Sequence, residues 1–297
     1  MLALNQIQGA SAADFTFTDE GTLVTAVGGA NSDVDTAPTR IIFDGAAGTT
    51  ITAEAPVVFT DRAVSIGTPI SSTFTLTAAS SFVGNCLICS NSSLTLNNII
   101  LDVAPKAGVS AISVEAAAPV TVILNNVEVA NVSGATAITV VGQAETTVTI
   151  NNSDIHNNTA GAGATEGATG GSVIVVNAAT DAIVTISGDT TITANTAGAG
   201  GAGVAQADGS PGGAGGSIVE VNVGANATVI IKETASITSN TSGVGGAGDV
   251  SDVIDPGGAG GAGGSTLAVV AVGDATVTIS DTAAITCLLY TSDAADE

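Results

Sequence analysis

The sequence has few aromatic and few basic residues. Aromatic residues make up 2% of the 297 positions, without any tryptophan, and four lysines and arginines stand against 27 acidic residues. Nucleic acids and anionic membrane surfaces bind through clustered lysine and arginine, so the net charge of −23 argues against both as partners. The scarcity of aromatic rings also argues against the irregular core of a compact enzyme, because small and β-branched residues suit a stack of thin layers.

Signals of membrane insertion and secretion are also missing. No apolar run approaches the roughly 18 residues of a membrane helix. The opening MLALNQIQGASAAD lacks the basic and apolar regions of a signal peptide. We interpret Met1 as an internal methionine of a longer chain, so the missing signal decides little. The scarcity of lysine, with abundant threonine, serine, asparagine and glycine, favours a secreted surface protein.

The last eleven residues, 287–297, differ from the rest of the chain. Their start, CLLYTS, resembles the translated end of a transposon adapter used for sequencing libraries. We interpret this segment as an artefact and leave it out of the fold, because residues foreign to the natural protein carry no information about its folding. The sequence is then expected to be a fragment of a longer protein.

Short segments of alternating apolar residues recur along the chain. They follow one another at intervals of 26, 36, 45 and 48 residues, and each is preceded by a second β-rich segment and followed by a short third one. Alternation of this kind predicts strands, and the asparagine, glycine and aspartate between them are typical of turns. The five segments are TVIL (121–124), TVTI (147–150), IVTI (183–186), TVII (228–231) and TVTI (276–279).

Three strands of four or five residues cannot form a stable sheet by themselves, because each repeat would have unpaired edges. Parallel pairing of each strand with its equivalent in the next repeat removes those edges. The sequence therefore predicts an all-β protein, a right-handed parallel β-helix. Its interior is expected to hold Val148, Val184, Val229 and Val277 with Ile150, Ile186, Ile231 and Ile279, while Thr149, Thr185 and Thr278 face outward.

The face of the preceding strand is not decided by the sequence. Glu220 must point outward, whereas the spacing of Ile112 and Val114 indicates the other face, and a shift of one residue reverses every side chain. Both alternatives for the segments at 112–115 and 217–221 remain open at this point.

Glycine-rich insertions account for the growing intervals. They occupy 161–171, 198–216 and 243–264, each after an asparagine and each closing on Gly-Gly-Ser. Insertions at one point of a repeat predict loops on one side of the stack. Such runs bury little apolar surface, so we expect them to be mobile, with stacking as polyproline II strands as the alternative.

We predict one domain without a linker. Residues 1–84 are expected to form the capping region and the first coils, because Phe15, Phe17, Phe43, Phe59, Phe74 and Phe82 all lie there. Residues 85–286 are expected to form the regular coils.

An asparagine element pairs with a glycine element in three successive repeats. The asparagines are Asn158, Asn195 and Asn240, and the pairs of glycines end on Gly171, Gly216 and Gly264. From the residues alone, we expect the asparagines to form an internal ladder at the turn where each insertion leaves. Over residues 150–286 these elements resemble the repeats of chlamydial-type polymorphic outer membrane proteins, which are autotransporter adhesins. The resemblance implies a cell-surface passenger, with an outer-membrane anchor beyond the C-terminal end of this sequence.

Four acidic residues occupy similar turn positions, which would stack carboxylates along the coils. Stacked carboxylates repel one another unless a cation bridges them, and oxygen ligands suit Ca²⁺. The alternative, which we favour, is that they are solvated turn residues. The four are Asp154, Asp189, Glu233 and Asp281.

Cys86 and Cys89 have the spacing of redox or zinc motifs, but no further cysteine or nearby histidine completes a tetrahedral site. Residues three apart in a strand point to opposite faces. A turn there would allow a local disulfide. We favour two packed thiols over a bridge.

The favoured function is a non-catalytic adhesin or structural stalk at the cell surface, expected to be monomeric, without a cofactor, and to meet host cells or glycans. The alternative is a carbohydrate-active β-helix enzyme, a polysaccharide lyase, glycosidase or tail-spike-like protein. Such enzymes need converging carboxylates, commonly with basic or aromatic residues for the sugar. The acids Glu115, Glu128, Asp181 and Glu220 have no visible partner in the sequence, and the single histidine, His156, is expected at the surface.

Overall fold

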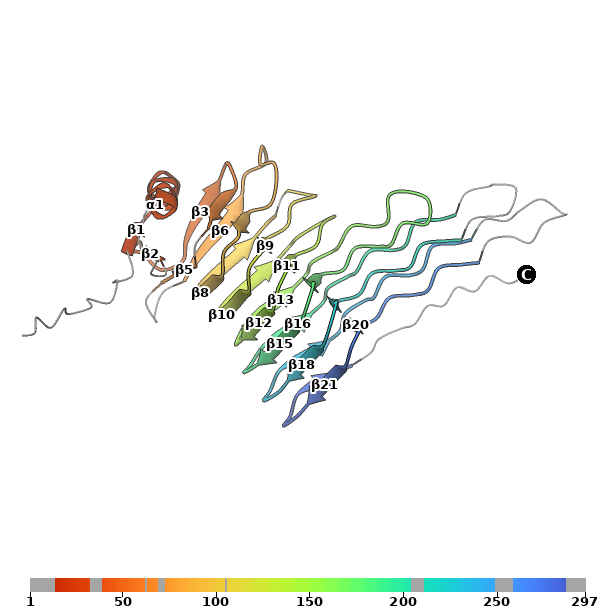
Figure 1. Cartoon of the computed structure of the whole chain (residues 1–297). Coiled ribbons are helices and arrows are strands. Elements are labelled where there is room, and N and C mark those ends of the chain that lie inside the picture. Colours follow the sequence, from red (N-terminus) through yellow and green to blue (C-terminus); the bar gives the residue numbers. More distant parts are fainter. Residues whose placement is uncertain are drawn as a thin grey trace, which may run out of the picture.

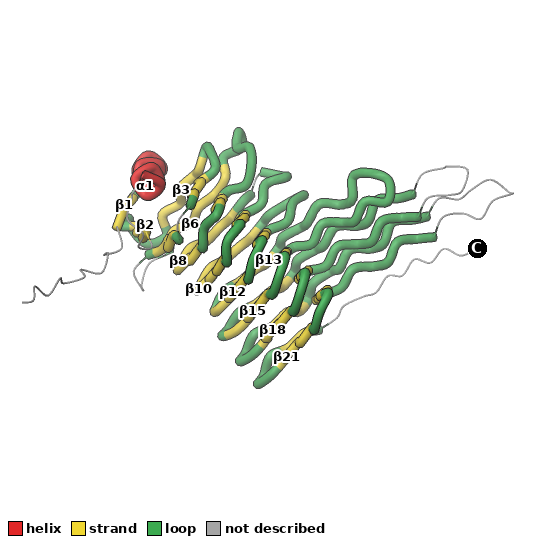
Figure 2. Tube along the Cα trace, in the orientation of Figure 1, coloured by secondary structure: helices red, strands yellow, loops and turns green. Residues whose placement is uncertain are grey.

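In the computed structural model, the strands of the chain form two long parallel sheets. The structure describes residues 14–32, 39–61, 63–68, 73–104, 106–203, 211–248 and 259–286. The segment 287–297 interpreted as an artefact lies outside these residues. Every strand pairing within them is parallel, and the strands form a 15-stranded and a 7-stranded sheet. Figures 1 and 2 show the strands stacked side by side, with the glycine-rich arms extending to one side.

The main path of the longer sheet is built from the second strand of each repeat. Its strands in spatial order are β1 (Asp14–Phe17), β2 (Thr39–Phe43), β5 (Val64–Gly67), β8 (Leu94–Asp102), β10 (Val120–Ala130), β12 (Thr146–Asn151), β15 (Ala182–Ser187), β18 (Ala227–Ile231) and β21 (Ala275–Ile279). Branches of the same sheet are β3 (Thr49–Ala53), β6 (Phe74–Ala78), β13 (Asp154–His156), β16 (Thr191–Thr193), β19 (Ser236–Thr238) and β22 (Ala284–Ile285).

The shorter sheet collects the first segment of each repeat. It consists of β4 (Val57–Thr60), β7 (Leu87–Ser90), β9 (Ile112–Ala116), β11 (Ile138–Gly142), β14 (Ile174–Ala178), β17 (Val219–Val223) and β20 (Leu267–Ala271). A repeat thus runs from the shorter sheet to the longer sheet and then to a short branch strand, as β14, β15 and β16 do. This agrees with the expected three strands per repeat.

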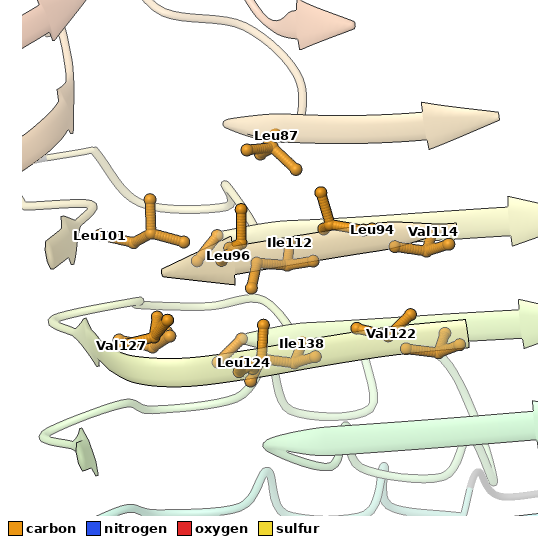
Figure 3. Close-up of a cluster of buried hydrophobic side chains, with 14 of the residues drawn as sticks. Leu87, Leu94, Leu96, Leu101, Ile112, Val114, Val122, Leu124, Val127 and Ile138 are labelled. Carbon is orange, nitrogen blue, oxygen red and sulfur yellow. The ribbon is translucent and has the colours of Figure 1, made fainter. Parts of the chain in front are cut away.

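The core lies between the two sheets and consists of aliphatic side chains. Leu94 and Leu96 of β8 are fully buried, as are Ile112 and Val114 of β9. Figure 3 shows these residues close together with side chains from neighbouring strands. Each fully buried valine or leucine contributes about 1.5–3 kcal/mol of transfer free energy, so repetition of small aliphatic layers replaces the aromatic core that the sequence lacks.

The register confirms the expected stacking of the valine column. Val148 lies opposite Val184, Val184 opposite Val229, and Val229 opposite Val277. The first three are buried, but Val277 is 46% exposed, and Ile279 of the same strand is 51% exposed. The expectation that these two residues are buried in the interior is therefore wrong here. Strand β21 is the last strand of its sheet, and no further strand among the described residues covers its free edge.

The face of the preceding strand is now decided. Ile112 and Val114 point inward, while Glu220 is half-buried between the buried Val219 and Val221 and points outward. Both constraints hold together because Ile112 shares its column with Ile138, Ile174 and Val219, which places Glu220 in the outward column one residue further on.

A helix, α1 (Glu20–Ser32), lies at the N-terminal end of the sheets (Figure 1) and was not expected from the sequence. Its buried residues are Leu23, Ala26 and Ala30. Asp19 caps it, because its Oδ1 accepts a hydrogen bond from the Thr22 amide at 2.8 Å, and this bond lowers the pKa of Asp19.

The phenylalanines fill the interior beside this helix. Phe17, Phe43 and Phe74 form a cluster with ring centroids 4.7–5.4 Å apart. All three are fully buried, and so are Phe59 and Phe82. These phenylalanines thus fill the N-terminal end of the core, and α1 packs over the same end.

Candidate functional site

Three buried asparagines mark the corner from which each glycine-rich arm leaves the sheets. Asn158, Asn195 and Asn240 are each at most 2% exposed. The side-chain amide of Asn158 donates to Asn195 Oδ1 at 3.0 Å, and that of Asn195 donates to Asn240 Oδ1 at 3.0 Å. The arrangement is the internal ladder expected from the sequence.

Each asparagine also holds the backbone of its neighbours. Asn195 Oδ1 accepts from the Asn158 amide at 3.1 Å, and Asn195 Nδ2 donates to the Ile155 carbonyl at 2.8 Å. The residue before each asparagine has a positive φ, as Ala194 does with φ 53°. The ladder therefore satisfies polar groups that a sharp corner would otherwise leave buried and unpaired.

The described parts of the three insertions form an ordered array of arms, which we call the glycine array: residues 160–171, 197–203 with 211–216, and 242–248 with 259–264. Amides of outgoing arms bond the next outgoing arm, as Gly200 does with the Val244 carbonyl at 2.8 Å. Returning arms bond outgoing arms, as Gly213 does with the Gly201 carbonyl at 2.8 Å. The donors recur every third residue, which is the period of a polyproline II helix.

The described residues of the insertions are hydrogen-bonded from arm to arm, and the period of three agrees with the alternative of stacked polyproline II strands. The expectation of mobility considered only the small apolar surface that these insertions bury. Backbone hydrogen bonds between the arms compensate for that small buried area. Glycine is required because a Cβ at Gly198 would lie 1.9 Å from the Gly161 oxygen, and one at Gly213 would lie 2.0 Å from the Ala168 oxygen.

The glycines that close each insertion have equivalent roles. Gly171, Gly216 and Gly264 each donate to the outgoing arm of their own insertion, at 2.7–2.8 Å. The following serines form a second ladder that the sequence did not reveal, in which the Ser217 amide donates to Ser172 Oγ at 2.8 Å. The repeated Gly-Gly-Ser was the available signal.

The four carboxylates proposed for calcium do not form one column. Glu233 and Asp281 are in register, with the Glu233 amide 3.1 Å from Asp281 Oδ2. Asp189 lies beside Thr234, and Asp154 pairs with Thr191 in β16. The acids lie at different distances from the aligned Ile150, Ile186, Ile231 and Ile279: Asp154 is four residues later, Asp189 three, and Glu233 and Asp281 two. Within the described ranges, no group of three or more histidine, cysteine, aspartate or glutamate residues is placed to hold a metal ion.

His156 and three of the four acids, Glu128, Asp181 and Glu220, have polar partners, whereas the Glu115 side chain makes no hydrogen bond or ion pair within the described residues. His156 Nε2 lies 3.1 Å from Glu128 Oε1 and 3.8 Å from Asp154 Oδ2. Asp181 Oδ1 accepts from the Asn226 amide at 2.9 Å, and Glu220 accepts from Asn222 Nδ2 at 2.8 Å. These contacts join neighbouring coils or residues of one strand, so they stabilise the stacking of the strands.

Both Cys86 and Cys89 are buried free thiols. They share the interior because the chain bends at Cys86, just before β7, so that the alternation of faces begins only at Leu87. Burial raises the pKa of each thiol to about 12. A disulfide between them, one of the two expected alternatives, is not formed in this structure.

We expect the two thiols to be unreactive in the folded protein. A Cys287→Ser variant, without reductant, should show no reaction with a thiol reagent at pH 8, and two equivalents after denaturation, because burial disfavours the thiolate. The raised pKa means that this contribution to stability is present below pH 9 and is lost as the pH rises toward 12. Rapid labelling of the native protein, or no labelling after denaturation, would contradict the assignment.

A surface hollow lies on the outer face near β2, β5 and β8. Its lining includes Arg40, Ser65, Thr68, Asn97 and Asn98, and no carboxylate among the described residues. It therefore lacks the pair of acids that glycoside hydrolysis uses.

No helix among the described residues has the length and apolar character to cross a bilayer. No family model, curated protein or solved structure matches the chain.

Proposed function

We propose that the chain winds as a right-handed parallel β-helix and serves as a non-catalytic surface rod, an adhesin or structural stalk. The observation that supports it most is the unbroken parallel register from β8 through β10, β12, β15 and β18 to β21. Chain connections from the shorter sheet to the longer sheet within each repeat are those that such winding requires.

The glycine array supports a role in presentation to other surfaces. Its arms are held by backbone hydrogen bonds and stand beside the sheets (Figure 2), which makes a broad lateral blade of backbone and small side chains. Glu166 is the one charged residue among the described residues of the array. Many weak contacts along such a blade would add through multivalency. In this proposal, the rod is a monomer at the cell surface, attached to an outer membrane by another part of the protein, and meets host cells or glycans.

Binding and cleavage assays on the full chain test this function. We expect saturable binding to cultured cells or immobilised glycans without release of reducing sugar or unsaturated product. Product release from any polysaccharide would contradict the non-catalytic assignment and favour a carbohydrate-active enzyme. If the protein binds none of the cell and glycan surfaces tested, the adhesin function is excluded and the structural stalk remains.

A further inference from the structure

The outer face of the longer sheet carries two columns of β-branched residues that no described segment covers. One column contains Thr121, Thr147, Ile183, Thr228 and Thr276. The other contains Thr95, Ile123, Thr149, Thr185, Ile230 and Thr278. We call these two columns the threonine face. Their side chains alternate with the buried valines and isoleucines, so they point away from the core.

The threonine face is uncharged although the chain is strongly acidic. Neither column contains an ionisable residue, whereas the sequence has 27 acidic residues. Glu145 and Asp181 precede β12 and β15, and Lys232 follows β18, so the charges lie in the turns beside the face. A surface of this kind matches a neutral partner and offers little to a charged one.

The hydroxyl groups on this face are uncommitted. Within the described part of the chain, Thr121, Thr147, Thr149, Thr185 and Thr228 make no side-chain hydrogen bond, in contrast to threonines elsewhere on the coils. Thr191 and Thr234, for example, each donate to an aspartate. The methyl groups and Ile183, which is 38% exposed, give the face apolar character between the hydroxyls.

The face is also a two-dimensional lattice. Neighbouring strands are about 4.8 Å apart, and outward residues two apart along a strand are about 6.7 Å apart. The register continues from β10 to β21 without a bulge. A single glycan chain repeats along one direction only, and the face has no aromatic ring for stacking on sugars. Both spacings are close to oxygen repeats in surface planes of hexagonal ice.

We propose that the threonine face binds ice. Hydroxyl and methyl groups at regular positions hold a layer of water in an order that matches the crystal surface. The χ1 rotamers of β-branched side chains are restricted, so little side-chain freedom is lost on contact. This activity goes beyond the proposed rod function and does not require the glycine array or any cell-surface ligand.

Ice growth in the presence of the full chain tests the proposal. We expect shaped ice crystals and a gap between melting and freezing temperatures for the wild type. Thr149→Tyr and Thr185→Tyr should reduce that gap at least tenfold, because a ring on either column holds the sheet away from the crystal. Thr193→Tyr, on β16 outside the face, should retain the wild-type gap. Circular dichroism and thermal melting show that each variant is folded.

Three results would overturn the proposal. The first is wild-type protein that leaves ice growth unchanged at millimolar concentration, and the second is an equal loss in Thr193→Tyr and Thr149→Tyr variants that are both folded. The third is binding to crystalline cellulose or chitin, but not to ice, which would assign the face to a polysaccharide crystal. Cell or glycan binding by the Thr149→Tyr variant tests the rod function separately.

Discussion

Asn195→Ala should lower the free energy of unfolding by about 3–5 kcal/mol, because each buried polar group that loses its partner costs about 1–3 kcal/mol. The substitution removes the partner of two groups, the Asn158 backbone amide and the Ile155 carbonyl. It also removes the side-chain bond to Asn240 Oδ1, which keeps its bond from the Asn195 backbone amide. Water cannot replace the lost bonds readily, since Asn195 is 1% exposed. Chemical denaturation followed by circular dichroism measures the change.

Asn177→Ala is the matched control for this prediction. Asn177 lies on the outer side of β14 and accepts one side-chain hydrogen bond, from Asn222 at 3.1 Å. A half-buried pair near solvent should contribute less than about 1 kcal/mol. Equal effects of the two substitutions, or a change within about 0.5 kcal/mol for Asn195→Ala, would show that the ladder does not stabilise the corner. Hydrogen exchange should also rise at the Asn158 amide in the Asn195→Ala variant.

The parts of the structure that follow from period-two patterns were predictable. Strands β12, β15, β18 and β21 coincide with the alternating segments, and the asparagine ladder follows from an asparagine repeated at one position. Errors arose where one residue changes the register. Asp154, Asp189 and Glu233 lie four, three and two residues after the aligned Ile150, Ile186 and Ile231, and this difference puts each in its own column. A count of residues between strands would have detected it.

Features that depend on several repeats together were harder to predict. Helix α1 has Gly28, Gly29 and several β-branched residues, which are poor helix formers. It is held by packing at the end of the sheets. The glycine array has no local sequence preference for order either, because its hydrogen bonds join separate arms, as between Gly198 and Gly171 or between Gly200 and Val244. Only the third-residue spacing of glycines within successive insertions indicated it.

Gly213→Ala should disrupt the glycine array and leave the sheets folded. Its Cβ would lie 2.0 Å from the Ala168 oxygen and 2.5 Å from the Ala168 carbonyl carbon, so one arm must move. Gly213 donates to the Gly201 carbonyl and accepts from the Gly246 amide, both at 2.7–2.8 Å. Loss of these bonds and of the neighbouring ones in both arms should cost about 2–4 kcal/mol. Amide exchange at Gly201, Gly213 and Gly246 should increase at least a hundredfold.

Gly263→Ala separates this close packing from the general effect of adding a methyl group to a glycine-rich arm. Gly263 lies in the last returning arm, and the nearest atom to its Cβ would be the Gly243 oxygen at 3.8 Å, an ordinary contact. We expect unchanged amide exchange and resistance to protease for this variant, and rapid cleavage within 197–216 for Gly213→Ala. If both variants stay protected, the arms tolerate a Cβ at their contacts and the array is looser than the hydrogen bonds indicate. If both become sensitive, glycine acts through backbone freedom at each position, and close approach between arms does not explain the insertions.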